Sequence, residues 1–309
     1  MLANFLAKSK PINFIIYFIL FLCFFLITAF SYLLNEQFEW YKVFECVSYF
    51  ILFLFIFFIY HLLVSKNRLT FDHSYAFFLF ILTITLFIFK LFDFKALFAL
   101  LLYLFFLRKV YNLQYSKNII KKVFDSGFWL GILFIIEPFS IFFFILIFTS
   151  ILLHQRATIN TVFTAIVGFA SPLIIYLAYL FWNDSPEKFI QSFRLDIFNH
   201  AIFYIESYSF WIFCVLLLLT IYSLFAKSLR AFSVNNLFKK SWLILIVNLI
   251  IAVIFTLFIS QNNGYEITFL LVPCSIIIAN GFETIKKNSI KSVLITLLLL
   301  ATLLTFFFS

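Results

Sequence analysis

Long apolar runs separated by short polar segments make up most of the chain. A helix of about 20 residues, rising 1.5 Å per residue, is long enough to cross a hydrocarbon core about 30 Å thick. Five runs reach that length, and a further pair of runs lies near the C-terminal end. They are Ile12–Leu34, Val43–Val64, Thr161–Trp182, Tyr208–Ala226 and Ser241–Ser260, followed by Ile267–Phe282 and Lys291–Phe308. The pattern predicts an all-α, polytopic transmembrane helix bundle.

Two other apolar regions are interrupted by charged residues. Ser74–Leu107 contains Lys90, Asp93 and Lys95, and Phe124–Leu153 contains the pair Glu137-Pro138. An acidic residue at the centre of a span costs about 2.5–3.5 kcal/mol on insertion scales, whereas the same residue in a turn reaches the membrane interface. The second region is therefore either one kinked span or a hairpin of two short spans. The choice reverses the side of every later loop.

The distribution of basic residues favours the hairpin, because Lys and Arg are enriched in cytoplasmic loops. With a cytoplasmic N-terminus and a turn at Glu137, the inner side holds 17 of the 22 basic residues; with a kink, the two sides hold equal numbers. The 17 are Lys8, Lys10, Lys66, Arg68, Arg108, Lys109, Lys117, Lys121, Lys122, Arg156, Lys227, Arg230, Lys239, Lys240, Lys286, Lys287 and Lys291. We therefore expect about eleven spans with two short hairpins and an external C-terminus. Glu137 should reach the membrane interface at an external turn, and Pro138 should begin the returning helix.

Composition agrees with a membrane location. Hydrophobic residues make up 65% of the chain and charged residues 11%, and the mean hydropathy is +1.13. Soluble domains are nearer half apolar and a quarter charged. Short basic clusters between spans explain the net charge of +9, so no nucleic-acid partner is expected. We expect residues 1–309 to form one integral domain in a bacterial inner membrane, with membrane lipids as its partners.

Acidic residues gather on the predicted outer side. They are Glu36, Glu39, Asp93, Glu137, Asp184, Glu187, Asp196, Glu206 and Glu266. Acids contribute little to topology, so this separation does not follow from the distribution of the basic residues. Either these acids build an external polar site, or they are scattered along solvated loops.

The longest external loop, residues 183–207, predicts an amphipathic helix in the outer interface. Asp184–Glu187, with the sequence DSPE, is typical of a helix start. Apolar residues then recur every four positions, at Phe189, Phe193, Ile197 and Ala201. The segment is either a membrane anchor or a surface on which Arg194 and His200 face a lipid phosphate.

Other polar positions carry weaker signals. The four histidines are not spaced as metal ligands, so we predict no metal site and no cofactor. Glu45, Asn248 and Asn280 interrupt apolar spans, which hydrogen bonding between helices or an ion path would explain. Gly127 and Gly131 form a GxxxG pattern, which predicts close packing between helices.

Three segments, KSKPINFII, NRLTFDHSY and FDSGFWLGI, resemble an uncharacterised bacterial family of polytopic inner-membrane proteins, over the whole chain. From about Leu97 to Arg194 the chain also resembles the GT-C superfamily of membrane glycosyltransferases. The second resemblance rests on the order of LLLYLFFLRKVY, SGFWLGILFIIEP, an apolar return ending in HQR, a long span and an external amphipathic segment. Members of that superfamily take sugars from polyprenyl-phosphate donors at the external membrane face.

The GT-C resemblance implies roles for residues on the external side. Its catalytic acid lies in the first external loop, here NEQFEW, so Glu36 or Glu39 would be the general base that takes a proton from an acceptor hydroxyl. Nearby charged residues would bind the lipid-linked substrate and its phosphate. These substrate-binding candidates are Lys42, Lys90, Asp93, Lys95, Arg194 and His200.

Two other classes of function compete with the transferase. One is a non-catalytic membrane subunit of an envelope or secretion assembly, which would bind a fixed protein partner. The other is a transporter, for which internal symmetry between the two halves is expected. The sequence contains no convincing repeat of that kind.

Overall fold

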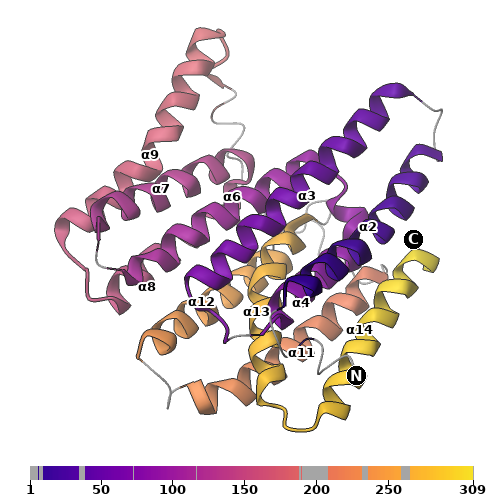
Figure 1. Cartoon of the computed structure of the whole chain (residues 1–309). Coiled ribbons are helices and arrows are strands. Elements are labelled where there is room, and N and C mark those ends of the chain that lie inside the picture. The colour runs from indigo at the N-terminus through magenta and orange to yellow at the C-terminus, as the bar shows by residue number, and fades with distance from the viewer. Residues whose placement is uncertain are drawn as a thin grey trace.

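The computed structural model describes Leu6 and residues 10–34, 39–71, 73–115, 117–187, 189, 208–231, 236–258 and 265–308. All regular structure within these ranges is helical (Figure 1). The longer helices are α2 (Pro11–Leu34), α3 (Trp40–Lys66), α9 (Ile159–Trp182), α11 (Tyr208–Ala231), α12 (Asn236–Phe258) and α14 (Asn288–Phe308). The shorter ones are α4 (Tyr75–Leu86), α5 (Ile88–Leu91), α6 (Phe94–Tyr111), α7 (Ile119–Ile136), α8 (Phe144–Leu153) and α13 (Thr268–Thr284). Three 3-10 segments accompany them: η1 (Asn112–Gln114), η2 (Pro138–Phe143) and η3 (Tyr265–Ile267).

Seven of the described helical segments are long and apolar enough to cross a membrane. They are Pro11–Leu34, Trp40–Lys66, Phe94–Gln114, Ile159–Trp182, Trp211–Ser228, Asn236–Thr256 and Asn288–Phe306. Large apolar side chains cover their outer faces: on α9, Ile174 is 64% and Ile175 66% exposed. A surface of this kind suits lipid and not water. The chain is therefore an all-α membrane protein, as the pattern of apolar runs predicts.

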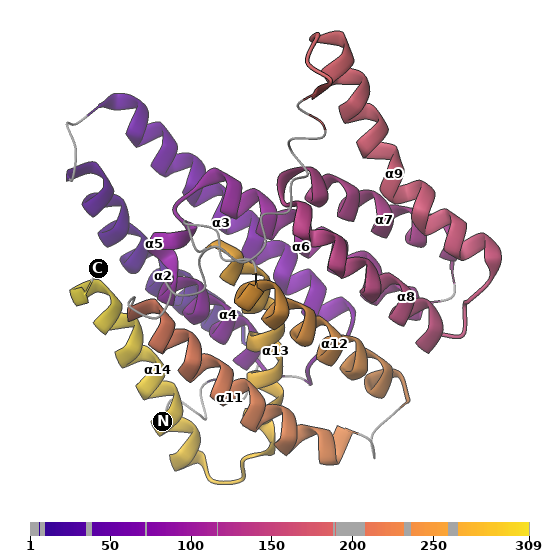
Figure 2. The ribbon, with the colours of Figure 1, turned by 180° about the vertical axis from the view of Figure 1, so that it is seen from behind.

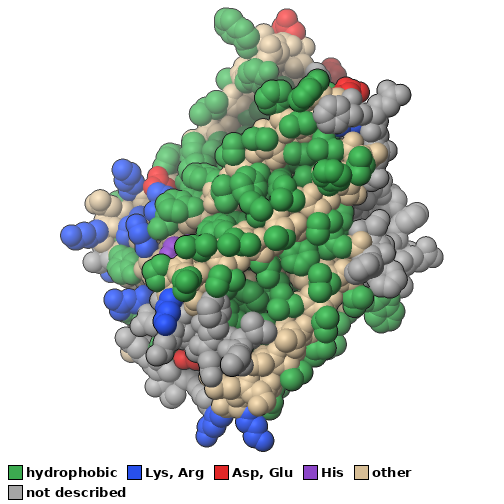
Figure 3. Space-filling model, turned by 45° about the vertical axis from the view of Figure 1, so that its right-hand side comes forward, with side chains coloured by type: hydrophobic (Ala, Val, Ile, Leu, Met, Phe, Trp, Pro, Cys, Tyr) green, Lys and Arg blue, Asp and Glu red, His purple; other side chains and the backbone are tan. Residues whose placement is uncertain are grey.

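Several helix ends meet on one side of the bundle. Tyr17 near the start of α2 shares a 2.8 Å hydrogen bond with Ser74 just before α4, and Gln114 at the end of η1 donates to the side-chain oxygen of Asn67, which follows α3 (3.4 Å). Most described basic residues lie here, and in Figure 3 they follow the left and lower edges, beside a hydrophobic middle. They include Lys66, Arg68, Lys109, Arg156, Lys227, Lys240, Lys286 and Lys291. We call this side the basic end.

The same helices meet again at the other side of the bundle, which we call the opposite end. Phe92, between α5 and α6, packs against Tyr32 at the end of α2 and Tyr49 near the start of α3, with ring centroids 5.3 and 4.7 Å apart. Phe255 near the end of α12 packs against Phe269 at the start of α13, with centroids 4.7 Å apart. Each of these helices therefore connects the two ends.

The helices α7 and α8 form a hairpin. Near the start of α7, Asp125 accepts a 2.6 Å hydrogen bond from Lys109 in the last turns of α6. Near the end of α8, Ser150 donates to the carbonyl oxygen of Val110, in the same part of α6 (3.0 Å). The start of α7 and the end of α8 thus lie at the basic end, so the chain reverses at Glu137 (Figure 2). Pro138 begins the 3-10 segment η2, which leads into α8.

Glycines allow α7 and α9 to pack with their backbones in contact. A Cβ atom added at Gly127 would clash with the carbonyl oxygen of Ala165, and one added at Gly131 would clash with that of Phe169. Both partners belong to α9. The GxxxG pattern therefore serves close helix packing within this chain, as predicted.

Polar residues inside the spans form hydrogen bonds between elements. The Tyr103 hydroxyl donates to Oδ1 of Asn248 (2.6 Å), and Tyr32 donates to Oε2 of Glu45 (2.8 Å). The Nδ2 of Asn280 donates to the backbone carbonyl of Leu69, in the loop after α3 (3.0 Å). All three polar positions therefore take part in hydrogen bonding between elements, as predicted.

Candidate functional site

The tips of two hairpins meet at the opposite end. Nζ of Lys95, in the first turn of α6, lies 3.7 Å from Oε2 of Glu137, which separates α7 from η2. The Lys95 side chain is 44% exposed, but Glu137 is fully buried. Glu137 thus lies in a turn between two helices, as predicted, but its side chain is enclosed by neighbouring elements and is not exposed at the protein surface. A lysine from the other hairpin offsets part of the cost of burying this carboxylate, so the turn can be covered by its neighbours.

A second lysine and acid lie at the same end. Burial lowers the pKa of Lys90, in α5, and the charge of nearby Glu266, in η3, partly offsets this effect. Glu266 itself is only 1% exposed. We call Lys90, Asp93, Lys95, Glu137 and Glu266 the hairpin-tip cluster. It combines residues from three parts of the chain that are far apart in sequence.

Local sequence sets the positions of Asp93, Lys95 and Glu137. Asp93 caps α6, because its Oδ2 accepts a 3.3 Å hydrogen bond from the backbone N–H of Ala96. Lys95 is thereby held in the first helical turn. Pro138 cannot continue the hydrogen bonding of α7, so α7 ends before Glu137 and the chain turns there.

Two buried hydroxyl groups follow the acids of the cluster in sequence. Ser140 lies in the turn after Glu137, and Thr268 begins α13 just after Glu266. Both residues are fully buried, and neither hydroxyl has a hydrogen-bond partner in the part of the chain that the structure describes. Buried polar groups of this kind are normally satisfied by water or a ligand. The hydroxyl groups of Ser140 and Thr268 are therefore available to form hydrogen bonds with water or a ligand.

The remaining sequence-predicted residues are not part of this cluster or lie outside the described ranges. Glu39 is exposed and precedes α3, whose N-terminal end extends beyond α5 (Figure 2). Lys42, in the first turn of α3, is 2% exposed. Glu36, Arg194 and His200 lie outside the described residues, as does most of the helix predicted over 183–207.

The sequence places Glu137 and Glu266 among the acids of a possible external polar site, but it does not indicate that they lie near Lys90 and Lys95. A signal was nevertheless present, because two apolar regions are interrupted at their predicted outer tips by charges of opposite sign. Such charges can offset one another only if the two hairpins lie side by side, which the sequence does not specify.

The fold and the site define a polytopic membrane protein with paired charges between its hairpin tips. The chain belongs to a family of unknown function (DUF6427), which matches residues 1–309. This agrees with the resemblance of its sequence segments to an uncharacterised membrane-protein family. No curated protein matches the chain, and no solved structure does.

Proposed function

We propose that this protein is a bacterial inner-membrane transferase that takes sugars from a polyprenyl-phosphate donor at the external face, in the manner of the GT-C superfamily. The observation that carries this proposal is the hairpin-tip cluster, in which Lys95 lies 3.7 Å from the buried Glu137. Ionisable groups within membrane proteins are costly, and their usual explanation is a functional one. A lipid-linked phosphate is a substrate that such lysines would suit.

The proposed topology has about eleven spans, with the N-terminus and the basic end in the cytoplasm. Two observations support it. The described basic residues gather mostly at one end of the bundle, and α7 and α8 run in opposite directions. On this orientation, the hairpin-tip cluster faces the external side, where lipid-linked sugar donors are used.

In the proposed reaction, Lys90 and Lys95 hold the phosphate of the donor. A carboxylate removes the proton from the acceptor hydroxyl, whose oxygen attacks the anomeric carbon of the sugar. The bond from that carbon to the phosphate oxygen breaks, and its electron pair leaves with the phosphate. Glu36 and Glu39 are candidates for this base by resemblance. Glu137 is a third candidate because it lies beside Lys95.

The test uses the full-length protein in lipid nanodiscs, with a polyprenyl monophosphate that carries a radiolabelled hexose. Loss of label from the lipid reports turnover, and retention of unglycosylated polyprenyl monophosphate reports binding. If Glu137 is the base, Glu137→Gln should lower turnover at least about 100-fold with little effect on binding. If the first external loop holds the base, the double variant Glu36→Gln, Glu39→Gln should do so instead.

Lys95→Gln should weaken binding of the polyprenyl monophosphate, because it removes a charge from the phosphate site. Asp184→Asn is the matched control for the acid variants and should leave turnover and binding unchanged. Asp184 is an exposed acid after α9 and is not a member of the cluster. Failure of the wild-type protein to bind the lipid, or full turnover in all of the acid variants, would overturn the proposal. Stable co-purification with one fixed protein, unchanged by these substitutions, would then favour a non-catalytic membrane subunit.

A further inference from the structure

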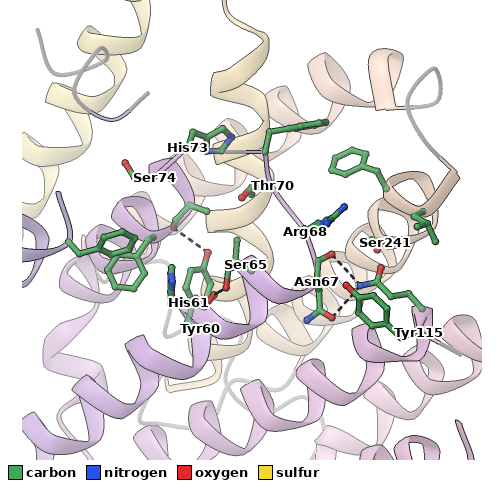
Figure 4. A pocket seen from close by; sticks show the side chains of 18 residues that line it. Tyr60, His61, Ser65, Asn67, Arg68, Thr70, His73, Ser74, Tyr115 and Ser241 are labelled. Carbon is green, nitrogen blue, oxygen red and sulfur yellow. Dashed lines mark hydrogen bonds between the residues drawn. The ribbon is translucent and has the colours of Figure 1, made fainter. Parts of the chain in front are cut away.

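A cavity of about 780 Å³ lies at the basic end, away from the hairpin-tip cluster. It is formed by the start of α2, the end of α3, the loop after α3, the segment from η1 to Tyr115, and the starts of α4 and α12 (Figure 4). Its volume falls within the range of about 300–1,000 Å³ that is typical of small-molecule sites.

The charged groups of the cavity wall are suited to an anion. Among the described residues that line it, 18 in number, one is arginine, two are histidine and none is acidic. Arg68 is exposed, and within the described ranges its side chain makes neither an ion pair nor a hydrogen bond. A guanidinium group offers several N–H donors in a planar arrangement that matches a phosphate or carboxylate.

His73, which also lines the cavity, has unused hydrogen-bonding groups. Both of its ring nitrogens are buried, and neither has a partner among the described residues. Burial lowers the pKa of His73, and Glu283 opposes this effect while Lys227 and Lys291 add to it. A neutral imidazole has one donor and one acceptor nitrogen, so a bound molecule or water would satisfy it.

The rest of the wall is largely aromatic. Phe14 packs against Phe77 with ring centroids 5.0 Å apart, and Phe71 packs against Phe238 with centroids 5.3 Å apart. Phe71 is 43% exposed and Leu237 is 51% exposed, so apolar side chains stand beside Arg68 in the wall. An anion that carries hydrocarbon would satisfy both kinds of surface, whereas a small hydrated anion would use only the polar one.

We propose that this cavity binds the phosphate-bearing headgroup of an anionic membrane lipid. The phosphate lies at Arg68, and the glycerol and first acyl carbons lie against Phe71 and Leu237. Basic pockets between spans at the membrane interface are suited to such headgroups. This site is separate from the hairpin-tip cluster, and it stands whether or not the protein is a transferase.

The experiment compares phosphatidylglycerol with phosphatidylcholine as ligands of the full-length protein in detergent, by native mass spectrometry. The wild-type protein should bind phosphatidylglycerol at least about tenfold more tightly. Arg68→Gln should remove this preference, because a charge-assisted hydrogen bond accounts for about tenfold or more in affinity. Arg68→Lys should retain part of it, since it keeps the charge but loses the planar group of donors. Lys286→Gln is the matched control, because it removes an exposed charge at the same end but outside the cavity.

A second variant tests the cavity without changing its charge. Ser65 is exposed on α3 and lines the cavity, so Ser65→Trp should fill the space and also weaken phosphatidylglycerol binding. Unchanged melting temperatures of the lipid-free Arg68→Gln and Ser65→Trp proteins would show that both variants remain folded. The proposal is overturned by equal losses in Arg68→Gln and Lys286→Gln, or by undiminished binding in Ser65→Trp. It is also overturned if inorganic phosphate at the same concentration displaces the lipid completely.

Discussion

Lys95 and Glu137 form an ion pair between the tips of two helical hairpins, with Nζ and Oε2 3.7 Å apart. The first hairpin consists of α4, α5 and α6, and the second of α7, η2 and α8. The carboxylate is fully buried, so its desolvation must be offset by nearby charges and hydrogen bonds. The pair therefore links the positions of two hairpins that are separate in sequence.

Lys95→Gln should destabilise the protein by about 1–3 kcal/mol, because it leaves the buried carboxylate of Glu137 with less compensation. Glu137→Gln should cost less, since it removes the buried charge and keeps the hydrogen-bonding groups. Denaturant titration in micelles would measure the free energy of unfolding of each variant. In a double-mutant cycle, the decrease in the free energy of unfolding of the double variant should be clearly smaller than the sum of the decreases of the two single variants. Additive losses would show that the two residues do not interact.

At the basic end, an ion pair with a buried lysine should contribute more than a pair of the same length in which both side chains are partly exposed. Lys227 and Glu283 are 2.6 Å apart, as are Lys109 and Asp125. The side chains of the first pair are 5% and 33% exposed, and those of the second pair are 30% and 24% exposed. Glu283→Gln should therefore cost about 1–3 kcal/mol and Asp125→Asn about 0–1 kcal/mol. The same unfolding titrations would compare the two variants. Equal losses would contradict the role assigned to burial.

The close packing of α7 against α9 should not tolerate a larger residue at Gly131. In Gly131→Val, the added side chain would meet the backbone of Phe169 and the ring of Pro172, which forces the helices apart. We expect a loss of about 1–3 kcal/mol in the free energy of unfolding. Ala178→Val is the control, because it also introduces a valine, at an exposed position of α9. A Gly131→Val protein as stable as this control would be evidence against the close contact.

Acidification should destabilise the protein through His154, which follows α8 and is 9% exposed. Burial lowers its pKa from 6.5 to about 4, with further lowering by Lys240 and Arg156. Between these values the unfolded chain binds the proton more readily than the folded one, so stability falls as pH decreases. The expected loss from this residue is about 2 kcal/mol between pH 7 and pH 5. Melting curves at both pH values should show a smaller decrease in His154→Gln than in the wild-type protein.

The proposed orientation makes a prediction about accessibility from outside the cell membrane. Gln155 is exposed at the basic end, and Asn183 is exposed after α9 at the opposite end. In a protein whose native cysteines are replaced, Asn183→Cys should react with a membrane-impermeant maleimide added from the periplasm. Gln155→Cys should react only after the membrane is permeabilised. Periplasmic labelling of Gln155→Cys would reverse the topology and move the hairpin-tip cluster to the cytoplasm.

The amino-acid sequence by itself determined the class of protein and most of its helices. The apolar runs predict α2 and α9 to within two residues of their observed bounds, because a span is recognised by its own length and composition. The turn at Glu137 was also predictable, since it follows from the total charge on each side of the membrane. These properties do not depend on which helices are neighbours.

Tertiary structure alone decided which residues face lipid, which are buried and which charges meet. In α2, Phe21 is 1% exposed and Phe30 is 66% exposed, although both are phenylalanines in one apolar run. Lipid and protein interior are equally apolar, so hydropathy does not distinguish the two faces. For the same reason, the pairing of Lys95 with Glu137 and the cavity beside Arg68 became visible only once the helices were placed side by side.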